Sequence, residues 1–86
     1  MPSKPHFHAG TWSPSEAGRF LQDHGFAMKR IKGDDCFWKG KRPDGIIVLV
    51  WYPLERKQLA DGTMRDSVMY KSGYPKTHWD LWRSLP

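Results

Sequence analysis

The chain has 86 residues, a net charge of +5 and an isoelectric point near 9.6. This length suits one domain with a small core, and its 38% hydrophobic and 14% aromatic residues exclude a disordered tail. The charge favours a polyanionic partner, with a nucleic acid as the first candidate and an acidic protein surface as the second. The alternative is that the charge only keeps a small domain in solution.

The single Cys36 has no partner for an internal disulfide or for a thiolate metal site, which favours a reducing, cytoplasmic setting. The first eight residues contain no apolar stretch of the kind that a signal peptide needs. The longest apolar run, Ile46 to Tyr52, is far too short to cross a bilayer. We therefore expect a cytoplasmic protein without a membrane partner.

Residues 1–12 contain Pro and Gly without apolar periodicity, which predicts a flexible arm, and residues 13–86 are predicted to form a single domain. Ser13, Pro14 and Glu16 are typical of a capping box with Pro at the first helical position. They predict a helix over residues 14–24, and Gly25 is its expected C-terminal stop.

Three strands are predicted next, over residues 26–32, 36–41 and 46–52, joined by turns that contain Gly33 and Gly45. Thr63 is expected to cap a second helix over 64–72, and Pro75 to open a last short helix. The predicted fold class is α+β, in the order α-β-β-β-α-α, with a three-stranded antiparallel meander and helices on one face.

Several short motifs occur in a definite order along these elements. Gly25-Phe26 leads into the first strand, and the stretch Arg30–Trp38 spans the first turn. Gly62-Thr63-Met64-Arg65 opens the later helix, and Gly73-Tyr74-Pro75 precedes the last one. In this order, over about residues 13–82, they resemble the HicA family of bacterial RNA-binding toxins.

The resemblance implies a fold like that of a double-stranded-RNA-binding domain, cleavage of messenger RNA, and an antitoxin partner. The catalytic His of the family aligns with Asp35, and the preceding Ser aligns with Asp34. Cleavage through the 2′-hydroxyl of RNA needs a general acid or base near neutral pH, a role that suits His and not an ionised carboxylate. We therefore expect no catalytic residue, and reduced or lost ribonuclease activity.

If cleavage persists, His24 and His78 are the residues to test first. Instead of a catalytic role, His24 can simply end a helix, where a cation is favourable. His78 has the corresponding alternative of a surface or packing role. The pair Asp34 and Asp35 is compatible with a magnesium ion, although a solvated turn is the commoner use of adjacent carboxylates. No metal and no cofactor are predicted.

Basic residues occur in two groups on the first two strands, where they can share a surface and contact phosphates. The neighbouring Phe37 and Trp38 point to opposite faces, so one ring is expected in the core and the other is available to stack on bases. The predicted nucleic-acid-binding residues are Lys29, Arg30, Lys32, Lys39, Lys41 and Arg42.

The third strand is apolar on both faces. Ile46, Val48, Val50 and Tyr52 share one face, and Ile47, Leu49 and Trp51, the predicted partner-binding residues, share the other. One face is expected to pack on the helices, whereas the opposite face of a three-stranded meander is normally polar and solvent-exposed. An apolar second face predicts a partner: a second copy in a homodimer, an antitoxin-like protein or another target. The alternative is that the N-terminal arm or the final helix covers it.

Two functions remain open from the sequence. The first is a HicA-like RNA-binding protein whose ribonuclease activity is reduced or lost. The second is a protein-interaction module, a decoy or an inhibitor, that reuses the HicA-like scaffold to bind a protein partner.

Overall fold

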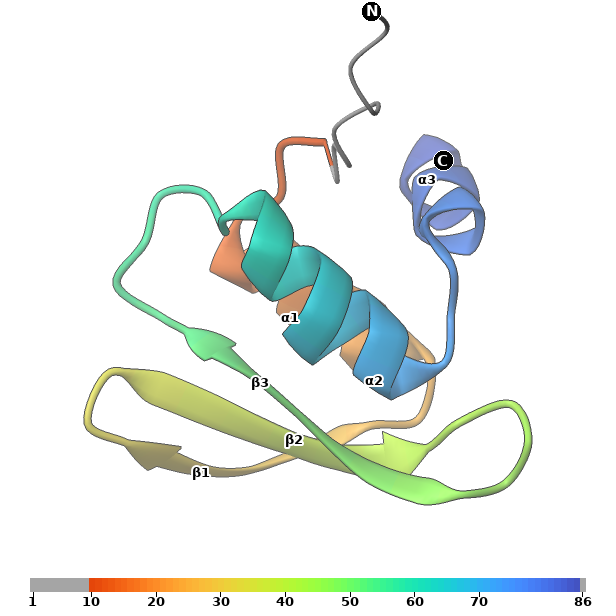
Figure 1. Cartoon of the computed structure of the whole chain (residues 1–86), viewed down its shortest axis with the longest axis horizontal. Helices are drawn as coiled ribbons and strands as arrows, with labels where there is room; N and C mark the ends of the chain where they lie inside the picture. Colours follow the sequence, from red (N-terminus) through yellow and green to blue (C-terminus); the bar gives the residue numbers. More distant parts are fainter. Residues whose placement is uncertain (1–9, 86) are drawn as a thin grey trace, which may run out of the picture.

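The computed structural model describes residues 10–85, and residues 1–9, most of the predicted arm, lie outside this range. In chain order the elements are helix α1 (Pro14–Asp23), strands β1 (Ala27–Lys32), β2 (Asp35–Lys41) and β3 (Ile47–Pro53), π-helix η1 (Thr63–Met69), and helices α2 (Tyr70–Ser72) and α3 (Lys76–Ser84). The strands form one antiparallel sheet in the order β1-β2-β3, and the helices lie on one side of it (Figure 1). The predicted α+β arrangement is confirmed.

Helix α1 begins at Pro14 as predicted and ends at Asp23, one residue before the predicted end. The backbone N–H of Glu16 donates to Ser13 Oγ at 3.2 Å, and the backbone N–H of Ser13 donates to Glu16 Oε1 at 3.1 Å. This reciprocal pair satisfies two N–H groups that the first helical turn leaves without intrahelical partners. Gly25 follows the helix with a φ of +84°, in the left-handed region that favours glycine.

The second helical stretch begins earlier than predicted. Gly62 has helical dihedral angles, and the N–H of Met64 donates to the carbonyl of Ala60 at 2.9 Å. Thr63 therefore lies inside the helical stretch, and its prediction as the N-cap is wrong. The N–H of Tyr70 donates to the carbonyl of Arg65, five residues earlier, which is the π-helical pattern.

An aromatic cluster joins α1 to α3. The rings of Phe20 and Trp79 are stacked with their centroids 3.5 Å apart, and Trp12 meets Trp79 edge-on at 5.2 Å. Trp12 is fully buried, and its carbonyl accepts from the N–H of Leu59 at 2.7 Å. Although the prediction assigned Trp12 to the flexible arm, it belongs to the core, so the packed domain extends at least to this residue.

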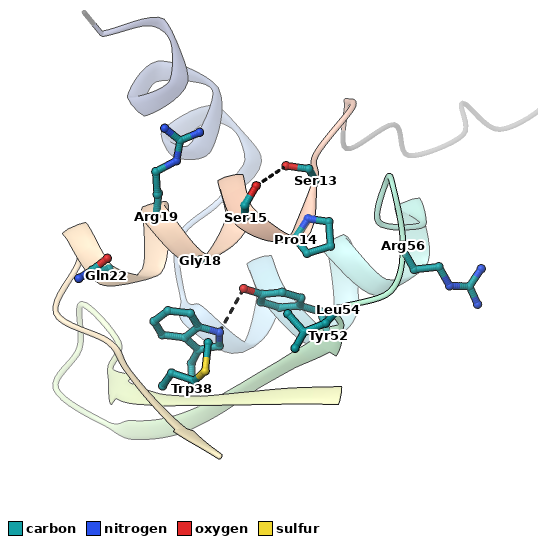
Figure 2. A pocket seen from close by; sticks show the side chains of 11 residues that line it. Ser13, Pro14, Ser15, Gly18, Arg19, Gln22, Trp38, Tyr52, Leu54 and Arg56 are labelled. Atoms are coloured by element: carbon teal, nitrogen blue, oxygen red, sulfur yellow. Dashed lines mark hydrogen bonds between the residues drawn. The ribbon is translucent and has the colours of Figure 1, made fainter. Parts of the chain in front are cut away.

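The core between α1 and the sheet contains a buried polar contact. Trp38 Nε1 donates to the hydroxyl of Tyr52 at 3.1 Å, beneath Gly18 of α1 (Figure 2). A Cβ atom on Gly18 would lie 3.0 Å from that hydroxyl and 3.1 Å from the Trp38 ring. The missing side chain of Gly18 therefore lets α1 lie directly on the two aromatic rings. Because the Tyr52 hydroxyl is buried beneath the helix, its pKa is raised above its usual value.

Candidate nucleic-acid interface

The face of the sheet that points away from the helices carries most of the predicted site. Along β2, Cys36 and Trp38 are buried, whereas Lys39 and Lys41 are exposed and Phe37 is partly exposed. Because successive side chains of a strand point to opposite faces, the latter three residues lie on the face opposite the helices. We call this side of the sheet the open face.

The register brings β1 and β3 residues onto the same face, because cross-strand partners share a side of the sheet. Phe37 pairs with Arg30 on one side and with Trp51 on the other. The Arg30 guanidinium lies 5.2 Å from the centroid of the Phe37 ring, within the range of a cation–π contact. Lys39 pairs with Leu49, and Lys41, the next residue on this face, with Ile47.

Residues predicted to bind a protein therefore lie directly across from residues predicted to bind nucleic acid: Leu49 pairs with Lys39, and Ile47 with Lys41. Ile47, Leu49 and Trp51 are 57%, 53% and 39% exposed, so neither α3 nor any other described element covers them. Apart from Arg42, the two residue sets, which were predicted separately, form one continuous surface of cations and apolar side chains.

Strand β1 contains a bulge at Lys29. Met28 pairs with Trp38 and Arg30 with Phe37, so that Lys29 has no partner of its own on β2. A bulge of this kind bends the strand and re-aims a side chain. Lys29 lines the same hollow as Lys39 and Lys41.

This hollow has a volume of about 480 Å³ and lies where β2 ends and β3 begins. Its lining is His24, Gly25, Lys29, Lys39, Gly40, Lys41 and Ile47, a set that includes no carboxylate. Among the described residues, none of the three lysines forms an ion pair. We call this feature the basic hollow.

Arg42 does not join the other predicted cations. Its guanidinium is paired with Asp44 at 3.2 Å, and its Nε is buried. A Cβ atom on Gly73, at the end of α2, would lie 3.1 Å from the Arg42 side chain. Arg42 therefore packs on the helix side of the sheet, as strand alternation after Lys41 requires, and is not part of the open face.

Asp34 and Asp35 have different surroundings. The carboxylate of Asp34 accepts from the N–H of Glu55 at 3.1 Å, and its carbonyl accepts from the N–H of Leu54 at 2.8 Å. Asp34 therefore holds the chain that follows β3. Asp35 pairs with Lys32 and with Pro53, which places it on the open face at the end away from the basic hollow.

His24 and His78 are brought into contact although 54 positions separate them. His24 Nε2 lies 2.9 Å from His78 Nε2, and His24 Nδ1 lies 2.7 Å from the carbonyl oxygen of Phe20. The His24 ring also stacks on Phe20 with the centroids 3.9 Å apart. Nδ1 of His24 thus bonds within α1, and Nε2 joins α1 to α3. This agrees with the alternatives for the two residues, a helix end for His24 and packing for His78.

A second hollow, of about 490 Å³, lies between α1 and the sheet and was not predicted. Figure 2 shows Trp38 and Tyr52 at its base, with Arg19 and Arg56 extending away from it in different directions. Because these cations do not converge, this hollow lacks the charge arrangement of the basic hollow. Gly18, at which α1 lies close to the two rings, also lines this hollow.

Within residues 10–85, no three side chains of His, Cys, Asp or Glu come together as a metal site would require. No helix in this range is long and apolar enough to span a membrane.

The chain matches no protein-family model and no curated protein. The resemblance to HicA toxins therefore stays a prediction from the sequence motifs.

Proposed function

We propose that the protein binds single-stranded RNA across the open face and has lost most or all ribonuclease activity. The observation that supports this best is the row Arg30, Phe37 and Trp51, followed along the same face by Lys39 and Lys41. Single-strand-binding surfaces combine aromatic rings, on which bases stack, with cations that follow the backbone. Arginine planes also stack on bases, so Arg30 extends the same platform.

The proposed loss of cleavage is supported by the acidic residue on that face and by the surroundings of the two histidines. Asp35 stands where the resembled family has its His, and the two histidines in the described residues contact each other. An ionised carboxylate repels phosphate and donates no proton at neutral pH. The proposal is thus of an RNA-binding protein, with an acidic residue at the position of the family's catalytic group.

RNA binding is tested by titrating the protein with a single-stranded oligonucleotide at several salt concentrations. We expect Phe37→Ala or Trp51→Ala to weaken binding by about 1–3 kcal/mol for each stacked base lost. Changing Lys29, Lys39 and Lys41 together to Gln should reduce the slope of log affinity against log salt by about 2.

The matched control changes Arg56, Arg65 and Lys71 to Gln, which removes the same charge from segments outside the sheet. It should leave the salt slope nearly unchanged. Equal effects of the two triple changes would show that only net charge matters. No binding by the unaltered protein at low salt would reject the proposal.

The exposed stripe on β3 favours a protein partner as the second candidate function. Ile47, Leu49 and Trp51 are apolar and lie side by side at the edge of the sheet. Contiguous exposed apolar side chains mark protein interfaces in many soluble domains. Leu49→Lys should preserve or strengthen RNA binding through its added charge. The same change should abolish any protein association that depends on this stripe. Sedimentation of the protein alone, and of the complex that it forms in its host, measures that association.

A further inference from the structure

We propose that the basic hollow binds a terminal phosphate monoester of the RNA strand whose bases lie over Phe37 and Trp51. This inference rests on the proposed RNA binding and adds a preference for one kind of RNA end. A phosphate inside the strand carries one negative charge, whereas a terminal monoester carries nearly two at neutral pH.

The charges of the hollow fit such a group. Three lysines, Lys29, Lys39 and Lys41, line it, and its lining includes no carboxylate. Lysine binds phosphate as a point charge, and hydrogen bonds to charged groups are stronger than those between neutral groups. An anion in the hollow would also relieve the repulsion among the three lysines.

The wall formed by His24 supplies shape rather than a ligand. Both of its ring nitrogens are engaged, one with Phe20 and one with His78. Gly25 beside it has open space where a side chain would lie. The hollow is thus walled by a fixed ring, is open at Gly25, and leaves the binding to the three lysines.

The position of the hollow points to a strand end. The open face carries Asp35 at one end, the row of Phe37 and Trp51 next, and the lysines of the hollow at the other end. Phe37 and Lys41 are four residues apart on β2, which corresponds to about 13 Å. A short oligonucleotide can therefore place bases over the rings and its terminal phosphate among the lysines.

The experiment compares oligonucleotides of one sequence, about six nucleotides long, that carry a 5′-phosphate, a 3′-phosphate or two hydroxyl ends. Isothermal titration calorimetry of the unaltered protein should show about tenfold tighter binding of one phosphorylated form. The two phosphorylated forms identify which end enters the hollow. Equal affinities of all three oligonucleotides would overturn the inference.

Two matched variants locate the effect. Lys29→Gln with Lys41→Gln removes two charges from the hollow, and Arg30→Gln with Lys32→Gln removes two charges from the same sheet outside it. The hollow variant should lose the preference for the phosphorylated end. The control variant should bind all three oligonucleotides more weakly and retain the preference. Loss of the preference in both variants would overturn the inference.

A failure of RNA binding as a whole is distinguishable from a failure of the hollow. If none of the three oligonucleotides binds, pyrophosphate alone is titrated while the melting temperature is recorded. A rise in the melting temperature of the unaltered protein and of the control variant, but not of the hollow variant, would support an anion site that works without RNA. No rise in any of the three would reject the site.

Discussion

His24 Nε2 lies 2.9 Å from His78 Nε2 and joins the end of α1 to α3. Because the carbonyl of Phe20 can only accept, the ring nitrogen of His24 that faces it must carry its proton. In the neutral ring the other nitrogen then accepts, so His78 Nε2–H is the donor. The contact thus defines the tautomers of both side chains.

This contact predicts energetic coupling between the two histidines. His24→Ala and His78→Ala are each expected to destabilise the protein, and the double variant should lose less than the sum. The difference should be about 0.5–1.5 kcal/mol, the net contribution of one hydrogen bond. Urea unfolding of the four proteins measures it, and strictly additive losses would contradict the contact.

The buried Cys36 and Tyr52 predict a loss of stability at alkaline pH. Burial raises the pKa of both groups above the values of 9.0 and 10.0 that they have in the unfolded chain. Above pH 9 the unfolded chain therefore loses protons that the folded protein keeps. The free energy of unfolding of the protein should therefore fall by up to about 1.4 kcal/mol per pH unit for each of the two side chains.

Cys36→Ala separates the two contributions. Its own cost in packing is the same at every pH, but the alkaline decline should begin near pH 10 rather than pH 9, because only Tyr52 remains. Unfolding by urea between pH 7 and 11 measures both curves. Parallel curves for the two proteins would show that Cys36 does not contribute.

Gly40 and Gly62 predict opposite effects of the same substitution. A Cβ atom on Gly40 would lie 2.5 Å from the Phe26 ring, whereas one on Gly62 would meet nothing within 4 Å. Gly40→Ala should destabilise the protein by about 1–3 kcal/mol through overpacking. Gly62 is helical, so Gly62→Ala should stabilise it by about 0.5–1 kcal/mol. Thermal unfolding of the two variants provides the measurement.

Asp35→His, combined with Asp34→Ser, tests the loss of ribonuclease activity. The change introduces a group that titrates near neutral pH and removes two charges that repel phosphate. We expect the unaltered protein to cut RNA weakly or not at all, and the double variant to gain metal-independent cleavage. General acid–base catalysis typically contributes about 10²–10⁴-fold. Strong cleavage by the unaltered protein in the presence of a chelator would contradict the prediction, and His24 and His78 would then be tested.

The secondary structure was predictable because its signals are local. The capping box of Ser13 and Glu16 and the left-handed Gly25 and Gly73 mark helix ends within a few residues. Strand β3 was equally clear, since a run of β-branched and aromatic residues from Ile46 to Tyr52 ends at Pro53. Thr63 misled because a hydroxyl residue before an apolar run resembles a cap, while the helical stretch had already begun.

The candidate site was only partly predictable because it depends on pairing across the sheet. The sequence indicates which residues are basic, but only the register places Arg30 beside Phe37. Contacts between distant parts of the chain, such as Trp12 with Trp79, leave no periodic signal. The bulge at Lys29 also leaves no signal in the sequence, since the residues on both sides of it read as an ordinary strand.

Strand β1 has one residue more than its ladder requires. Without Lys29, the order Met28, Arg30, Ile31 would alternate across the sheet with the partners that these residues already have on β2. A deletion of this single residue should therefore leave the fold, the register and the open face in place, and remove only one cation from the hollow. The extra residue Lys29 contributes a side chain to the surface and nothing to the pairing of the strands. Its deletion therefore separates the effect of this surface cation on binding from the stability of the sheet.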